Sequence, residues 1–130
     1  MSIAGYNVKT TTIVVPDPTA DATFTVFKAP LGGATLVAAY AAFSAAIAAD
    51  ATNKITVSLL DAGTDGSGTT EMATRVGGAS VGWSANQLHA LTISDYDVDE
   101  GDQIHVKYDE SGTVAPGYLT VVLHWVQGGT

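Results

Sequence analysis

The chain has 130 residues, 46% of them hydrophobic, and this length and composition fit one folded domain and argue against disorder. Thirteen acidic residues against five basic ones give a net charge of −8. Such a charge repels nucleic-acid phosphates and anionic membrane surfaces, so we expect neither as a partner. Cysteine is absent, which excludes disulfides and thiolate chemistry.

Runs rich in Thr and Val, broken by Gly or Pro about every ten residues, predict a series of short β-strands. Pro16 and Pro18 cannot donate to a strand ladder and therefore end the first run. Alternation of apolar and polar residues is clearest at KITVSLL, where Ile55, Val57 and Leu59 share one face. The predicted strands, in chain order, are Tyr6–Val15, Ala22–Ala29, 34–49, Lys54–Leu60, Thr70–Val76, Leu88–Ser94, Gln103–Tyr108 and Tyr118–Val126.

The alanine-rich segment 34–49 fits two kinds of secondary structure. Leu36, Tyr40, Phe43 and Ile47 recur at helical spacing, and alanine favours a helix. The two-residue alternation of a β-strand also fits the segment, because Val37, Phe43 and Ile47 then share one face. Strand-like runs flank the segment, so we expect a long bent strand and keep the helix as the alternative. The segment is too short and too weakly hydrophobic to span a bilayer.

This pattern predicts an all-β fold, a single-domain β-sandwich that is jelly-roll-like and has about eight strands. We divide the chain into an N-terminal strand or arm, residues 1–21, and the β-sandwich domain, residues 22–130. The first ten residues, MSIAGYNVKT, lack the basic segment and apolar run of a secretory signal, so we expect none.

The stretch SDYDVDEGDQ holds five acidic residues in eight positions and is the richest polar chemistry in the chain. Asp95, Asp97 and Asp99 match the first ligands of an EF-hand loop, but Glu100 replaces the required Gly and Val106 stands at the position of the final Glu. We therefore expect a solvated turn. A looser calcium site built from Asp95, Asp97 and Asp99 is the alternative.

No pattern for catalysis survives inspection. In GWSAN, Asn86 replaces the last Gly of the nucleophile motif around Ser84. Paired carboxylates across a cleft are not indicated, and the glycine-rich loop 63–68 lacks the Lys of a phosphate loop. The histidines lack the close spacing of metal ligands: His89, His105 and His124. We expect a protein that is not an enzyme, without catalytic residues or cofactors.

The last predicted strand is apolar on both faces, which is typical of a strand that another chain covers. Leu119, Val121, Leu123 and Trp125 form one face, and Tyr118, Val122 and Val126 make the other substantially apolar. Together with segment 34–49, this predicts a homo-oligomer, with a trimer preferred. The candidate interface residues are Tyr6, Val8, Tyr40, Phe43, Tyr118, Val122 and His124.

Three stretches resemble small virion structural proteins of tailed bacteriophages: FKAPLGGATLVAAYAAF, NKITVSLLDAGTDGSGTT and GDQIHVKYDESGTVAPGYLTVVLHWVQGG. The resemblance covers roughly Phe24 to Gly129. It implies an all-β protein that is made in the host cytoplasm and resides on the capsid surface of the virion. There it would decorate or cement the shell as a trimer by binding the major capsid protein and itself.

An alternative function is a glycan- or receptor-binding module of a phage head fibre or tail, with or without calcium. It would use aromatic side chains near the acidic stretch, of which Trp83 and Tyr96 are the candidates. Exposure of either ring beside the acidic stretch would favour this alternative.

Overall fold

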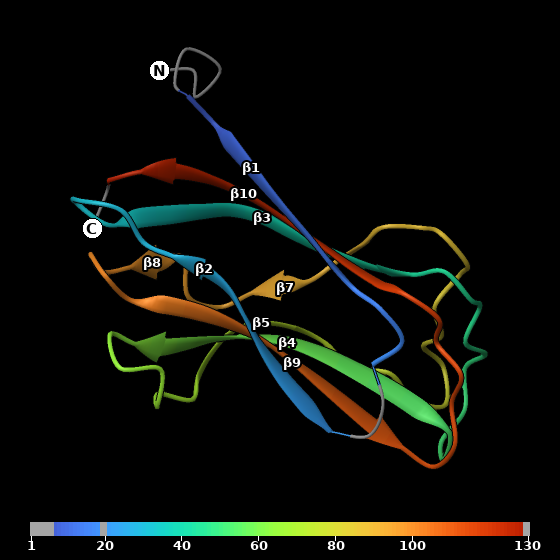
Figure 1. Ribbon diagram of the computed structural model, residues 1–130. Helices are drawn as coiled ribbons and strands as arrows, with labels where there is room; N and C mark the ends of the chain where they lie inside the picture. The colour runs from blue at the N-terminus through green and yellow to red at the C-terminus, as the bar shows by residue number, and fades with distance from the viewer. Residues whose placement is uncertain (1–6, 19–20, 129–130) are drawn as a thin grey trace.

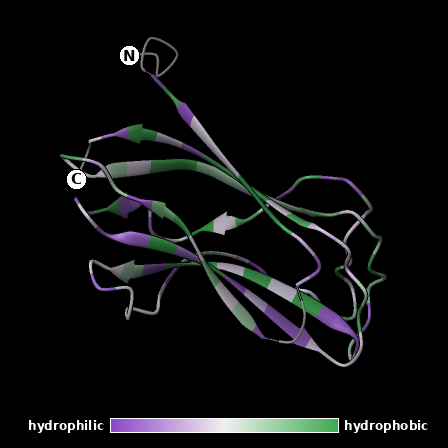
Figure 2. Cartoon of the chain, viewed as in Figure 1, coloured by the Kyte–Doolittle hydropathy of each residue, from purple (hydrophilic) through white to green (hydrophobic). Residues whose placement is uncertain are grey.

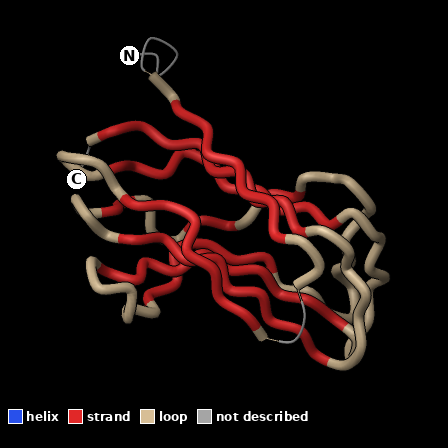
Figure 3. Tube along the Cα trace, viewed as in Figure 1, coloured by secondary structure: helices blue, strands red, loops and turns tan. Residues whose placement is uncertain are grey.

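The computed structural model describes residues 7–18 and 21–128, and every regular element in these ranges is a β-strand (Figures 1 and 3). This confirms the all-β prediction and resolves the ambiguous segment in favour of a strand. The strands are β1 (Lys9–Val15), β2 (Ala22–Lys28), β3 (Ala34–Phe43), β4 (Lys54–Gly63), β5 (Thr70–Arg75), β6 (His89–Ala90), β7 (Thr92–Ile93), β8 (Asp97–Val98), β9 (Gln103–Ser111) and β10 (Leu119–Gln127).

Two antiparallel sheets pack against each other to make the β-sandwich (Figure 1). Sheet A has the order β1-β10-β3-β6, with β8 also pairing with β3, and sheet B has the order β2-β9-β4-β5-β7. The first strand thus pairs with the last and the second with the next to last. Further inward, β3 pairs with β8 and β6, and the neighbours β4 and β5 pair with each other. A long hairpin rolled up in this way is the strand order of a jelly roll.

Alternating side chains from both sheets fill the space between them. Ile55, Val57 and Leu59 of β4 are fully buried, as their spacing predicts, and Figure 2 shows hydrophobic and more polar residues alternating along this strand. The inward residues of β9 and β10 are equally buried: Ile104, Val106, Tyr108, Leu119, Val121 and Leu123. Burial of each aliphatic side chain contributes about 1.5–3 kcal/mol, so this common core holds the two sheets together.

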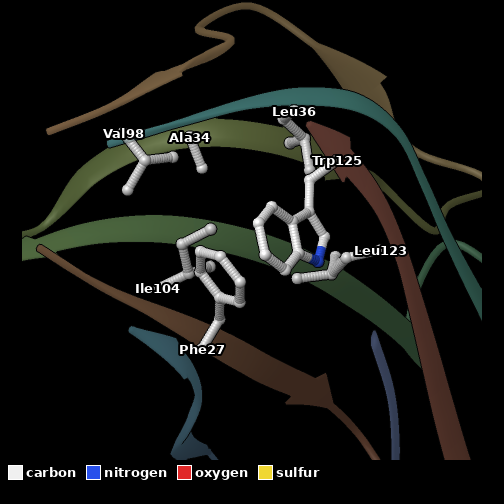
Figure 4. Close-up of a pocket in the computed structure, with 7 residues that line it drawn as sticks. All are labelled: Phe27, Ala34, Leu36, Val98, Ile104, Leu123 and Trp125. Carbon is white, nitrogen blue, oxygen red and sulfur yellow. The ribbon is translucent and has the colours of Figure 1, made fainter. Parts of the chain in front are cut away.

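One end of the core is closed by an aromatic pair (Figure 4). The rings of Phe27 and Trp125 meet edge to face with centroids 4.8 Å apart. Trp125 also donates its indole N–H to the Thr11 hydroxyl over 3.0 Å, which satisfies its polar atom. The gap between these rings and their aliphatic neighbours has no room for a water molecule, so it is packed core and not a ligand site.

A β-bulge in β3 corrects the predicted parity of segment 34–49. Leu36 pairs with Trp125 and Ala38 pairs with His124, so Val37 has no partner across the ladder. The extra residue shifts the alternation by one, and Leu36 and Ala39 both face the core while Val37 is 37% exposed. The prediction that Val37 and Phe43 share a face was therefore wrong.

The predicted strand also ends earlier than expected. Beyond Phe43, only Ile47 makes a further bridge, to Trp83.

The single strand predicted at Leu88–Ser94 is divided between the two sheets. β6 joins β3 in sheet A, β7 joins β5 in sheet B, and the buried Leu91 lies between them. β8 then returns to sheet A within the acidic stretch. Two short strands thus replace one predicted strand, and β8 adds a further strand in the stretch predicted as a turn, which accounts for ten observed strands instead of eight.

The N-terminal strand belongs to the sandwich and not to a separate arm. β1 pairs with β10 over its whole length, from Lys9 opposite Trp125 to Val15 opposite Leu119. Ile13 and Val15 pack on the core. The domain boundary predicted at residue 21 therefore has to move to the N-terminal side of β1. Of the predicted arm, residues 1–6 and 19–20 lie outside the described part of the chain.

Candidate functional site

Among the described residues that point away from sheet B, the outer face of sheet A carries a single charged side chain: Asp97 of β8, which pairs with Thr35 at one end of the sheet. We call this surface the A face. Its register places Thr12, Val122, Tyr40 and Ala90 in one row across the sheet. By register, the set is Thr10, Thr12, Val14, Thr35, Ala38, Tyr40, Ala42, Ala90, Asp97, Thr120, Val122, His124 and Val126.

Two rings lie near the middle of the A face. Tyr40 and His124 meet edge to face, with centroids 5.6 Å apart and an interplanar angle of 67°. Both side chains are half-buried, and Val14 on the neighbouring strand is 54% exposed. The A face is thus a surface of Thr, Val and Ala with an aromatic centre, and its one charged residue, Asp97, lies at the end where β8 pairs with the start of β3.

Three of the predicted interface residues, Tyr40, Val122 and His124, come together on the A face, although they lie far apart in the chain. Val8 is exposed just before β1. Tyr118 is exposed just before β10, where its backbone N–H donates to the Ser44 hydroxyl.

Two predicted interface residues do not contribute to this surface. Phe43 was wrongly assigned, because its side chain is 0% exposed and packs on Trp83 and Tyr108 in the core. It has no surface to offer a partner. Tyr6 lies outside the described residues.

The outer face of sheet B, here the B face, is polar. One row crosses all five strands, with Thr23, Lys107, Ser58, Thr74 and Thr92 in register. The face is hollowed around this row, with a volume of about 360 Å³. Sequence reasoning missed this hollow because its residues come from separate strands. The only signal was the polar parity of Thr56 and Ser58 and of Gln103, His105 and Lys107.

The acidic stretch folds into a turn that includes β8. The carboxylate of Glu100 accepts the backbone N–H of Gly32 over 2.8 Å, and Asp95 accepts the N–H of Asp97 over 3.1 Å. Gly101 adopts a φ of 82°, which glycine reaches without strain. Among the described residues, no three His, Cys, Asp or Glu side chains gather closely enough to hold a metal ion. The structure therefore does not assemble Asp95, Asp97 and Asp99 into a calcium site.

Two carboxyl pairs lie at the margins of sheet B. Burial raises the pKa of Asp102, and the charge of Asp61 and a hydrogen bond with it raise this pKa further. A hydrogen bond with Asp21 raises the pKa of Asp109, followed by burial and the charge of Asp21. Each pair brings two acidic groups together, so each costs stability when both are ionised.

Trp83 is a core residue, and its ring is held on several sides. The indole N–H donates to the carbonyl of Ile55 over 3.3 Å, and the side chain is 2% exposed. The Arg75 guanidinium lies 4.8 Å from the ring centre and donates to the carbonyl of Gly82 over 2.7 Å. Trp83 therefore cannot form an exposed glycan platform with Tyr96. Tyr96 alone, which is 50% exposed within the acidic stretch, meets the condition that favours the glycan-binding alternative.

Ser84 is not arranged as a nucleophile. Its backbone N–H, and not its hydroxyl, faces His89, donating to Nε2 over 3.1 Å. Burial lowers the pKa of His89, and the charge of Arg75 lowers it further. This local network fastens the loop after β5 to the sandwich.

The other two histidines lie on opposite faces. His105 is within 3.1 Å of the Thr25 hydroxyl on the B face, and His124 packs on Tyr40 on the A face.

No protein-family model matches this chain, and neither the curated proteins nor the solved structures include a match. The described part of the chain has no helix with the length and hydropathy needed to cross a membrane. Function must therefore be argued from the two outer faces.

Proposed function

We propose that the chain is a structural virion protein that decorates or cements a bacteriophage capsid by binding the major capsid protein and copies of itself. The resemblance of its turn and strand motifs to such proteins suggests the role. The jelly-roll order is compatible with it, since this architecture occurs in viral capsid proteins, although a fold alone does not define a function.

The observation that carries the proposal is the low charge of the A face, whose single charged side chain, Asp97, lies at one end. Copies of a chain with a net charge of −8 repel each other wherever their acidic surfaces meet. The uncharged part of this face, around Tyr40 and Val122, lets two proteins approach without bringing like charges together or burying an unpaired charge. The A face is therefore the surface on which self-association costs least.

The composition of the A face supports the same conclusion. Tyr40 offers a large ring with a polar tip, the kind of side chain that is enriched at protein interfaces. Val122 lies beside it in register, and small Ala38 and Ala90 allow close approach of a neighbour. We propose a trimer as the association state, in which the A face contributes to the contacts between subunits.

Cementing would follow from mass action. A protein that binds the assembled shell but not free capsid subunits favours the assembled state by the free energy of its binding. This role requires a rigid scaffold and two interaction surfaces, and it requires no catalytic group.

Co-sedimentation with capsids that lack the protein tests the proposal. We expect the wild-type chain to sediment with the capsids and to raise the temperature at which they disassemble. Val122→Lys places a charge on the A face, so it should disrupt the contacts between subunits and with them the binding to capsids. Thr25→Lys places the same charge on the B face and should leave the binding unchanged. Failure of the wild-type chain to bind capsids would refute the function.

A further inference from the structure

The middle of the B face gathers hydroxyl groups from four strands around one ammonium group. Thr23 and Ser58 flank Lys107 on either side, and Thr74 and Thr92 extend the row. β9, β4 and β5 are the interior strands of this five-stranded sheet, so the backbone that carries Lys107, Ser58 and Thr74 is paired on both sides.

The hollow over this row has the size of a small ligand site. Its volume of about 360 Å³ lies within the range of roughly 300–1,000 Å³ that is usual for ligand pockets. Glu71 and Asp109 line it with carboxyl groups, and Leu60 and Val76 add apolar surface.

Part of the polar lining is already ordered. Ser58 is only 6% exposed, and its hydroxyl lies 3.0 Å from that of Thr74. Thr74 in turn donates to the carbonyl of Val57 over 3.4 Å. Since these two hydroxyl groups are fixed by the protein, a ligand that bonds to them would not have to order them.

The chemistry of the lining selects against ions and favours hydroxyl-rich ligands. Each Ser or Thr hydroxyl both donates and accepts, as a sugar hydroxyl does. Lys107 supplies donors, while Glu71 and Asp109 supply acceptors, so opposite charges are balanced to within one unit. Among the described residues the acidic groups do not cluster as metal ligands.

From these observations we propose that the hollow of the B face binds a neutral carbohydrate of one or two sugar rings. Sugar hydroxyls would bond to Thr74, Ser58 and Lys107, and the C–H face of a ring would lie on Leu60 and Val76. This proposal does not rest on the capsid role, because it uses the opposite face of the sandwich.

An NMR titration of the ¹⁵N-labelled chain tests the site. The probes are glucose, galactose, N-acetylglucosamine, maltose and cellobiose, each raised to tens of millimolar. We expect at least one of them to shift amide signals of β4, β5 and β9 near the hollow and to leave those of β1 unchanged. If none of the five sugars shifts these signals, the proposal is overturned.

Two variants locate the binding. Lys107→Met and Thr74→Val each remove polar groups while keeping much of the side-chain volume. Each should lower the affinity for the sugar about tenfold. Thr12→Val on the A face is the matched control and should bind as the wild type does. Lys107 is exposed, so its variant should fold even if Thr74→Val does not. Unchanged affinity in Lys107→Met would overturn the assignment.

Discussion

The two sheets bury their inner faces in the same way, yet their outer faces differ in charge. Sheet A presents Thr, Val, Ala, Tyr and His with Asp97 as its one charged residue, whereas sheet B presents Lys107, Asp109 and Glu71 among its hydroxyl groups. Folding requires only that alternate residues be apolar on the inner side. The outer faces are free of this constraint, so their difference is where evidence about function lies.

The largest expected effect comes from a residue that serves both sheets. Phe43→Ala should lower the free energy of unfolding by about 3–5 kcal/mol, because it removes a ring from the centre of the core. Chemical denaturation measures this change. If Phe43 were an interface residue, the variant would instead unfold like the wild type at low protein concentration and differ only in association.

A change on the A face should affect association and not folding. Tyr40→Ala should weaken self-association about 30-fold, equivalent to about 2 kcal/mol for a residue at the centre of an interface. Sedimentation equilibrium measures the association constant, and Thr25→Ala on the B face is the control. Equal effects of the two substitutions would remove the distinction between the faces.

A smaller effect is expected from pH, and it belongs to sheet B. The pKa values of Asp102 and Asp109 are raised in the folded state above the usual 3.8. The folded chain therefore takes up these protons before the unfolded chain does, and stability should rise as pH falls from 7 toward about 4. His89 opposes this rise below about pH 6.5, because its lowered pKa makes the unfolded chain bind that proton before the folded chain does, so the rise from the carboxyl pairs belongs to the lower part of the window. Contributions from Asp50 and Asp65, whose pKa values are lowered by backbone hydrogen bonds, diminish only below the window.

Asn substitutions assign this pH effect. Asp102→Asn and Asp109→Asn each remove one ionisable partner of a carboxyl pair, so both should raise the melting temperature at pH 7 and flatten the rise toward lower pH. Thermal melts of the variants and the wild type between pH 7 and about pH 4 measure these changes in melting temperature. Melting temperatures that fall at pH 7 in both variants would show that the pairs stabilise the fold instead.

The fold could be predicted where local alternation decides the structure. Ile55, Val57 and Leu59 alternate without interruption, and all three are buried as predicted. The bulge at Val37 could not be predicted, because it depends on how β3 aligns with β10 at the far end of the chain. The division of β6 from β7 likewise depends on which sheet each pair of residues can reach.

The same distinction applies to the candidate sites. The two-sided apolar pattern of the last strand led to Val122 and His124, which do lie together on the A face with Tyr40. Phe43 was assigned to the interface because segment 34–49 is apolar on both faces, but Phe43 lies on the face that packs into the core. The hollow of the B face combines residues from four strands, so no single stretch of sequence could reveal it.

The central claim is that the A face is covered by other copies of this chain, and the mass of the protein in solution tests it most directly. Light scattering at micromolar concentration should give three times the chain mass of 13.3 kDa for the wild type and for Thr25→Lys. Val122→Lys should give the mass of one chain while remaining folded by circular dichroism. A wild-type chain that is monomeric under these conditions would contradict the claim.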